Sequence, residues 1–195
     1  MDVLLILAHP CPDSFNHAIS DRVLSVLREL GHQCIFHDLY AEDFEPCLPC
    51  DEIALEATVS ADVQHYCDEL TAADALVIIH PNWWGQMPAI LKGWVDRVIR
   101  NSVAFEYPEG SDGTGMPRGL LANMRAVVFN TADTPPEHEA RTVGDPLEAI
   151  WKRSVFGFSG LTDVRRRMFA PVASSSRQQR RAWLAEAEDI IRNQF

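Results

Sequence analysis

Residues 81–94 of this chain read Pro81-Asn82-Trp83-Trp84-Gly85-Gln86-Met87-Pro88-Ala89-Ile90-Leu91-Lys92-Gly93-Trp94. They follow an unbroken apolar run from Ala75 to Ile79, which is typical of a strand buried on both faces of a parallel sheet. From Ile90 onward the apolar residues recur at helical spacing. The stretch therefore predicts a strand, a short loop with two tryptophans and a glycine, and an amphipathic helix.

The two tryptophans of this loop favour a ligand site. Loops at the carboxyl ends of strands are where open α/β sheets bind ligands. Large aromatic side chains such as Trp83 and Trp84 suit a planar ring system better than a sugar or a metal ion. The alternative is that both side chains pack in the core or at a subunit contact, because tryptophan is highly buried on average. Residue type alone leaves both interpretations open.

Strands and helices alternate along the rest of the chain. The residue patterns predict strands over 3–8, 34–37, 75–79, 126–129 and 164–169, with the second and the last at the sheet edges. They predict helices from Asp13 or Ser14 to Gly31, over 62–71, 90–100 and 145–156, and a last helix that begins at Ser175 or Ser176. Residues 39–58 are expected to form an irregular acidic connection, and residues 108–119 a mobile surface loop.

This alternation predicts one α/β domain, residues 1–195, with a single doubly wound five-stranded parallel sheet and helices on both faces. Flavodoxin has this architecture with strand order 2-1-3-4-5, and it binds its flavin at the switch point between strands 1 and 3. In this chain the loops after the corresponding strands are residues 9–14 and 81–85. Both unusual loops are therefore expected to meet in one crevice.

The composition restricts the classes of function. A net charge of −11, from 17 Lys and Arg against 28 Asp and Glu, argues against sequence-independent binding to nucleic acid or anionic membranes. No apolar run approaches the roughly 18 residues of a spanning helix. The N-terminal apolar residues lack a basic segment before them, so they fit a first strand better than a signal peptide. We expect no nucleic-acid partner, no membrane insertion and a cytoplasmic location.

The five cysteines favour free thiols, because their number is odd and no secretory signal precedes them. Cys47 and Cys50 form a C-x-x-C motif, but a zinc site would need a second ligand pair, and no cysteine follows Cys67. The motif also lies in a loop rather than at the start of a helix after a strand, where redox-active pairs occur. We expect no metal site.

The loop after the first strand, residues 9–17, ends at a predicted helix N-terminus. Free backbone N–H groups and the helix dipole bind anions there. Ser14 and Asn16 add donors, and His9 adds a donor or a charge, although the loop is neither a P-loop nor a G-x-G-x-x-G turn. Taken alone, simple capping by Asp13 or Ser14 explains the loop. Because it lies opposite the tryptophan loop, phosphate binding is the better interpretation.

Two patterns together resemble a known family. They are His9 followed by Ser14-Phe15-Asn16, and Pro81-x-Trp83-Trp84-Gly85-x-x-Pro88-Ala89-x-Leu91-Lys92-Gly93-Trp94-x-Asp96. Both are similar to the flavodoxin-like NAD(P)H:quinone oxidoreductases, the group of DT-diaphorase and modulator of drug activity. The resemblance implies a flavin bound by the loops after strands 1, 3 and 4, and a homodimer with the active site at the subunit contact. It implies that Ser14, Phe15 and Asn16 contact the flavin phosphates and that Asn82 to Gly85 lie along the isoalloxazine ring.

Two segments depart from the family pattern. The family's Thr-Thr-Gly-Gly loop, whose backbone donors meet the flavin pyrimidine edge, is here residues 130–133, and the Asp133 carboxylate would lower the flavin reduction potential if it faced the ring. The family's Tyr and His that assist hydride transfer lie in a longer segment, which leaves His138 as a candidate against the alternative of a solvated loop histidine. The cofactor-binding residues that we predict are His9, Ser14, Phe15, Asn16, Pro81, Asn82, Trp83, Trp84, Gly85, Asn130, Thr131, Ala132 and Asp133.

The resemblance therefore implies a flavin-dependent NAD(P)H oxidoreductase that reduces a quinone or similar acceptor. If one face of the ring serves both substrates in turn, the kinetics are ping-pong. The Ser-Phe-Asn match favours FAD over FMN.

A one-electron carrier of the flavodoxin type is an alternative that fits the negative charge, and NADH-driven turnover would exclude it. A non-catalytic regulatory subunit that binds flavin or nucleotide is another, marked by tight complex formation with negligible turnover. A hydrolase is disfavoured because no G-x-S-x-G elbow occurs.

Overall fold

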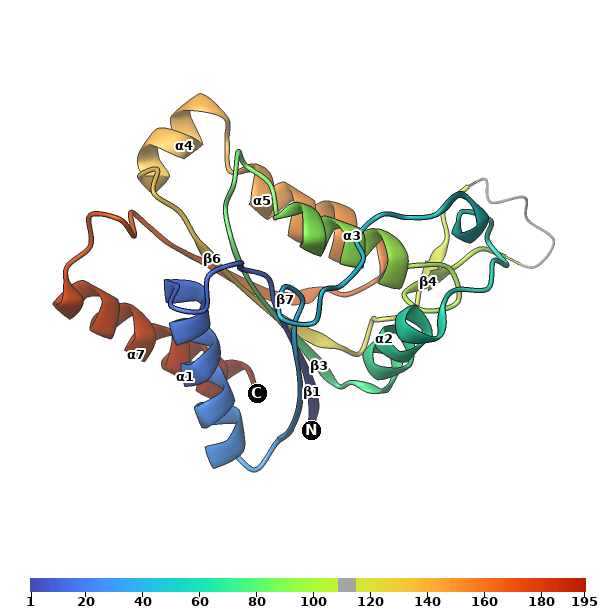
Figure 1. Ribbon diagram of the computed structural model, residues 1–195, viewed down its shortest axis with the longest axis horizontal. Helices are drawn as coiled ribbons and strands as arrows, with labels where there is room; N and C mark the ends of the chain where they lie inside the picture. Colours follow the sequence, from blue (N-terminus) through green and yellow to red (C-terminus); the bar gives the residue numbers. More distant parts are fainter. Residues whose placement is uncertain (109–114) are drawn as a thin grey trace.

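The computed structural model describes residues 1–108 and 115–195 (Figure 1). Its centre is a five-stranded sheet in the order β2-β1-β3-β6-β7, and all neighbouring strands run parallel. The strands are β1 (Asp2–Leu7), β2 (Gln33–Asp38), β3 (Ala75–Pro81), β6 (Arg125–Thr131) and β7 (Asp163–Phe169). Because β4 (Phe105–Glu106) and β5 (Arg118–Gly119) pair only with each other, this order is the predicted 2-1-3-4-5. The predicted doubly wound α/β fold is confirmed.

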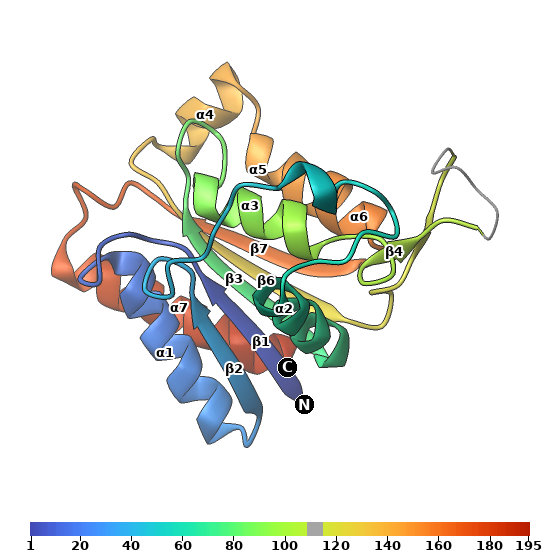
Figure 2. The same ribbon diagram turned by 45° about the vertical axis from the view of Figure 1, so that its right-hand side comes forward.

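Helices cover both faces of the sheet (Figures 1 and 2). One face packs against α1 (Phe15–Glu29) and α7 (Arg177–Gln194). The other packs against α2 (Ala61–Ala72), α3 (Ala89–Val98) and the segment from α5 (Pro146–Glu148) to α6 (Phe156–Phe158). Alternate residues of the central strands enter the two layers. This is why β1 and β3 appear in the sequence as continuous apolar runs.

Serine side chains begin three of the helices. Ser14, Ser60 and Ser176 are the N-caps of α1, α2 and α7, and each side chain accepts a hydrogen bond from the backbone N–H three residues later. The sequence left two candidates for the N-cap of the first helix and two for that of the last. The structure shows that the caps are Ser14, not Asp13, and Ser176, not Ser175. After α1, Gly31 adopts φ +77°, which is the left-handed conformation that ends helices.

The predicted helix over 145–156 is confirmed, with Asp145 as its N-cap and Pro146 in its first turn, but its middle is a π-helix, η2 (Ala149–Val155), which separates α5 from α6. One prediction of local structure is wrong. Residues 135–139 are not a loop, since α4 (Pro136–Thr142) occupies most of that segment. Pro136 is in the first turn of α4, where proline is tolerated because its missing N–H would have no partner within the helix.

The acidic connection after β2 is irregular, as predicted, apart from one short turn, η1 (Cys50–Glu52). It is fixed to α3 by Arg97, which binds the Glu52 carboxylate at 2.7 and 3.0 Å and the Glu45 carbonyl at 2.7 Å. The Arg97 guanidinium lowers the pKa of Glu52 by hydrogen bonding. All five cysteines are unbridged, and Cys47 and Cys50 are exposed.

Half of the surface loop predicted over 108–119, residues 109–114, lies outside the described residues, and the last two residues of the range form β5. Within the described ranges, no helix combines the length and apolar character needed to cross a membrane.

Candidate functional site

Two adjoining cavities lie where β1, β3 and β6 reach their carboxyl ends. One has a volume of about 340 Å³ and the other about 450 Å³, and Asn82 and Ala132 line both. The smaller cavity is further lined by His9, Asp13, Ser14, Phe15, Asn16, Pro81, Trp83, Thr131, Asp133, Val172, Ala173 and Arg180. The larger is further lined by Trp84, Gly85, Thr134, His138, Glu139, Thr142, Val143 and Pro146. The structure thus brings the loops at 9–14 and 81–85 to one crevice.

A cavity of about 570 Å³ lies elsewhere, beside α2 and the residues that follow β2. Several of its polar side chains are bonded to one another: Glu42 accepts from Tyr66 at 2.5 Å and lies 3.0 Å from His37. It lies near the carboxyl end of the edge strand β2, not at the switch point between β1 and β3, where sheets of this type bind ligands. We therefore place the candidate site at the crevice.

The tryptophan loop is a tight turn. Trp83 and Gln86 exchange two backbone hydrogen bonds of 3.0 Å, and Trp84 and Gly85 between them have φ +58° and +73°. Positive φ at both central positions is the mark of a type I′ turn, which normally carries Asn-Gly. Tryptophan rarely adopts this conformation, and such outliers cluster at ligand sites.

The turn projects Trp84 into solvent. The Trp84 side chain is fully exposed in the chain, and Trp83 is 42% exposed, so the alternative that both pack in the core is wrong. Asn82 stabilises the turn because its Oδ1 accepts the Gly85 N–H at 2.9 Å. Its amide nitrogen donates to both carboxylate oxygens of Glu139, at 2.8 and 3.0 Å. Helix α4 and the turn are thereby joined across the larger cavity.

The smaller cavity has the character of an anion site at one end. The N–H groups of Phe15 and Asn16, in the first turn of α1, have no partner within the helix. Ser14 and Arg180 line the same space. Arg180 is held by bonds to Ser175 Oγ (2.8 Å) and to the Val172 carbonyl (3.1 Å). Arg180 is not among the residues predicted from the sequence, where its only signal is the basic character of the first turns of the last helix.

Two residues at this end, Asn16 and His9, are held by hydrogen bonds to the protein. The Asn16 amide is buried and pairs with Thr131 Oγ1 at 2.9 Å, so it joins α1 to β6. His9 Nδ1 lies 3.1 Å from the Cys11 N–H and 3.3 Å from the Cys11 carbonyl, so the Cys11 backbone orients the ring. Burial lowers the pKa of His9, which favours the neutral ring.

A second hydrogen-bonded chain supports Ser14. Its Oγ lies 2.9 Å from His17 Nδ1, and His17 Nε2 lies 3.0 Å from the Asp38 carboxylate. Phe15, next to Ser14, packs in a group of rings with Phe169 and Trp183, with centroids 6.2 and 5.8 Å away. Phe15 therefore fixes the start of α1 as well as lining the cavity.

The segment from Asn130 to Asp133 is only partly what the sequence predicted. Asn130 and Thr131 are residues of β6, not of a loop, and the Asn130 side chain is fully buried and lines neither cavity. Thr131, Ala132 and Asp133 do line the smaller cavity. The Asp133 carboxylate accepts the Ala173 N–H at 2.7 Å, so it holds the chain after β7 in place and lies outside the wall of the larger cavity.

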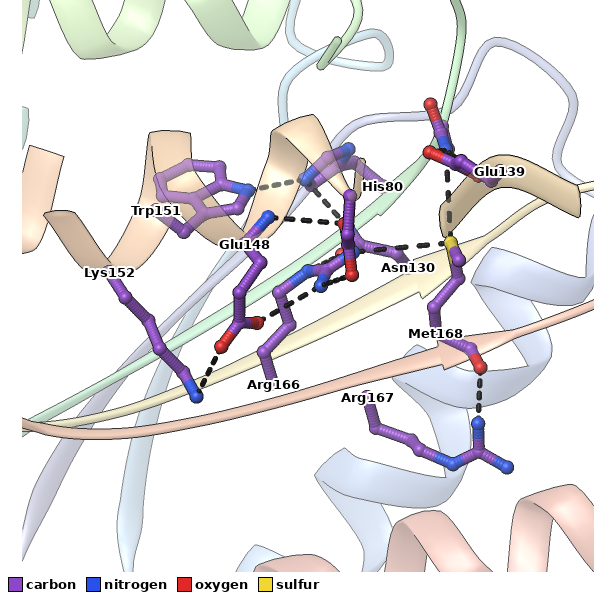
Figure 3. A network of polar contacts seen from close by, with 11 residues as sticks. His80, Asn130, Glu139, Glu148, Trp151, Lys152, Arg166, Arg167 and Met168 are labelled. Atoms are coloured by element: carbon purple, nitrogen blue, oxygen red, sulfur yellow. Dashed lines mark hydrogen bonds and ion pairs between the residues drawn. The ribbon is translucent and has the colours of Figure 1, made fainter. Parts of the chain in front are cut away.

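A buried polar network supports the floor of the crevice (Figure 3). Trp151 Nε1 and the Asn130 amide nitrogen both donate to His80 Nε2, at 2.9 and 2.8 Å, so the His80 proton is on Nδ1, 2.8 Å from the Pro81 carbonyl. Arg166 donates to Asn130 Oδ1 at 2.6 Å and pairs with the carboxylates of Asp145 and Glu148 at 2.7 and 3.1 Å.

This network ties β3, β6, β7 and the π-helix together directly below the tryptophan turn. The π-helix carries Trp151, and π-turns are often found near functional sites. Burial lowers the pKa of His80 to about 3, with the positive charge of Arg166 as a lesser contribution. His80 is therefore neutral at physiological pH and acts as a hydrogen-bond acceptor.

The titratable groups on the larger cavity are His138 and Glu139 of α4. His138 is exposed, as the solvated alternative predicts, but it stands on a helix. Glu139 is 95% shielded from solvent, and the sequence analysis gave it no role. Within the described residues, no group of three or more His, Cys, Asp or Glu side chains is arranged to hold a metal ion.

Comparisons with known proteins agree with the fold. A family model described as "Flavodoxin-like fold" matches residues 1–193. A protein named "Uncharacterized NAD(P)H oxidoreductase" from Haemophilus influenzae is 29% identical over 94% of this chain and 91% of its own length. The crystal structure of Smu.1420 from Streptococcus mutans UA159 is 30% identical, with a TM-score of 0.85 over 99% of this chain and 100% of its own. The NAD(P)H:quinone oxidoreductase from Methanothermobacter marburgensis is 27% identical, with a TM-score of 0.84 over 99% and 96%.

The buried, neutral state of His80 predicts a pH dependence of stability. Because the pKa in the folded protein lies below the ordinary value of 6.5, the unfolded chain binds the extra proton, and stability is lost as the pH falls from about 6.5 towards 3. In urea unfolding at several pH values, the free energy of unfolding of His80→Gln should fall less steeply between pH 6 and 4, by about 1.4 kcal/mol per pH unit. The matched control, His138→Gln, should keep the slope of the unsubstituted protein. Equal slopes for all three proteins would contradict a neutral, buried His80.

Proposed function

The chain belongs to the flavodoxin-like fold family, and from that premise we propose that it is a flavin-dependent NAD(P)H oxidoreductase that reduces quinones or similar acceptors. The observation that carries the proposal is the pair of adjoining cavities at the switch point. One offers donors for an anion, and the other is flanked by an exposed tryptophan held on a left-handed backbone. A phosphate joined to a planar ring fits this combination.

The described residues fit a flavin. Its phosphate would lie at the N-terminus of α1, where Ser14, the first N–H groups of the helix and Arg180 converge. Its ring would extend past Asn82 and Ala132, which line both cavities, to lie beside Trp84. The bound flavin supplies the chemistry of accepting and donating hydride. We propose FAD as the form, on the match of residues 14–16 to the family pattern, with FMN as the alternative.

The contribution of the protein is to position groups and to exclude water. Asn82 and Glu139 hold the turn that carries Trp84, and the network around His80 fixes the strand ends beneath it. The larger cavity would admit the nicotinamide and the acceptor in turn against one face of the ring. His138 is the exposed side chain on that cavity that can exchange a proton with an acceptor.

The relatives favour an enzyme over the other two candidates. The names of the Haemophilus influenzae and Methanothermobacter marburgensis proteins include NAD(P)H oxidoreductase activity, and each is similar to nearly the whole of this chain. A one-electron carrier remains consistent with the net charge of −11. Neither it nor a regulatory subunit that only binds flavin needs room for a second planar ring beside the flavin.

We expect Trp84→Ala to weaken flavin binding. The loss of one stacked aromatic side chain should cost on the order of 1–3 kcal/mol, or about ten- to a hundredfold in affinity. Apoprotein titrated with FAD and with FMN, followed by quenching of flavin fluorescence, gives both affinities, and FAD should bind more tightly. Wild-type protein that takes up neither flavin would refute the proposed function. Unchanged affinity in a folded Trp84→Ala protein would remove Trp84 from the ring site.

The shared cavity predicts the kinetic order. If nicotinamide and acceptor use the same space, the first product must leave before the acceptor enters, and double-reciprocal plots at several acceptor concentrations should be parallel. Rapid mixing with NAD(P)H alone should bleach the flavin fully before any quinone is added. Intersecting lines, or bleaching that requires both substrates, would mean that two sites are occupied at once.

We also propose a homodimer that covers the mouth of the larger cavity. Trp84 is fully exposed and Val143 is 63% exposed, and both line that cavity. Exposed apolar side chains gathered at the mouth of a cavity are typical of an interaction surface. Sedimentation equilibrium should give twice the chain mass of 21.9 kDa. A monomer mass at micromolar concentrations would contradict this assignment.

A further inference from the structure

Glu139 is a buried carboxylate with unused hydrogen-bonding capacity. It is 5% exposed, and its side chain lines the larger cavity. Its two oxygens share one partner, the amide nitrogen of Asn82, at 2.8 and 3.0 Å. In the part of the chain that the structure describes, no Lys, Arg or His forms an ion pair with it. A carboxylate offers about four acceptor sites, so most of its capacity remains free.

The orientation of the Asn82 amide determines which of its atoms faces Glu139. Asn82 Oδ1 accepts the Gly85 N–H at 2.9 Å, which requires the amide nitrogen to face Glu139. Glu139 must therefore act as an acceptor towards the turn. Its remaining lone pairs can be satisfied only from the cavity, by water or by a ligand that presents a donor. A buried carboxylate without such donors is costly.

We propose that Glu139 is a specificity-determining residue that accepts a hydrogen bond from an amide N–H on the planar ring entering the larger cavity. This inference rests on the proposed function and adds a requirement to it, because a ring without an amide N–H would leave the carboxylate unpaired. Two sources offer the same chemistry. One is the carboxamide of the nicotinamide, and the other is the N3–H of the flavin pyrimidine ring.

The decisive variant is Glu139→Gln. Glutamine keeps the shape of the side chain, and its oxygen can still accept from Asn82, so the turn should persist. Its NH₂ group then faces the cavity and cannot accept an amide N–H. The matched control is Glu137→Gln, because Glu137 is exposed on the same helix and lines neither cavity.

The first arm tests the nicotinamide. Flavin-loaded protein is titrated by calorimetry with the oxidised dinucleotide that it uses, NAD⁺ or NADP⁺, and with the 3-acetylpyridine analogue, in which a methyl group replaces the carboxamide NH₂. Wild-type protein and Glu137→Gln should bind the carboxamide form about tenfold or more tightly than the analogue. Glu139→Gln protein should bind the carboxamide form and the analogue with nearly equal affinity.

The second arm tests the flavin. Apoprotein is titrated with FMN and with N3-methyl-FMN, and the same loss of preference in Glu139→Gln would assign the donor to the flavin. Loss of either preference in Glu139→Gln supports the proposal and shows whether the nicotinamide or the flavin supplies the N–H group. Wild-type protein that binds both members of each pair equally well, or Glu139→Gln protein that keeps both preferences, would overturn it. Failure of wild-type protein to bind any flavin or nucleotide would instead refute the proposed function, and the inference with it.

Discussion

The reversal of winding direction between β1 and β3 is the constraint on which the crevice depends. The chain leaves β1 towards the face covered by α1 and leaves β3 towards the face covered by α3. The loops that follow these two neighbouring strands therefore run to opposite faces of the sheet. A gap opens between the two loops at the carboxyl ends of the strands. In the central strands, successive apolar side chains point alternately to the two faces of the sheet, and both helical layers pack against them. The position of the gap thus follows from the same residues that form the core.

The gap is given its shape by polar contacts rather than by the core. Trp84 occupies a backbone conformation that costs free energy for a bulky residue, and such a conformation persists only where its surroundings determine it. Those surroundings are Asn82, which bonds Gly85 and Glu139, and the buried network of His80, Asn130 and Arg166 below. Because each donor in this network finds an acceptor, the strand ends are held rigidly under the turn. Rigid support suits a site that must align two planar rings.

Much of this could be predicted from the sequence, and the reasons are physical. The strand order and the crevice follow from apolar periodicity, which records burial directly. Ser14 could be predicted as a cap, though not separated from Asp13, because both side chains can accept the same N–H. The buried role of Asn130 could not be predicted, since it depends on Arg166 and His80 meeting from distant strands. Arg180 and Glu139 were missed for the same reason: a charged residue on a helix becomes part of a site only when tertiary structure turns it towards a cavity.

If the two cavities form one flavin site with the ring beside Trp84, a crystal structure of the protein grown with FAD or FMN will show it. We expect density for the phosphate at the first turn of α1, near Ser14 and Arg180, and for the ring between the turn at residues 82–85 and the side chains of α4. Flavin density at any other place, or a phosphate at α1 with the ring directed away from Trp84, would contradict this expectation.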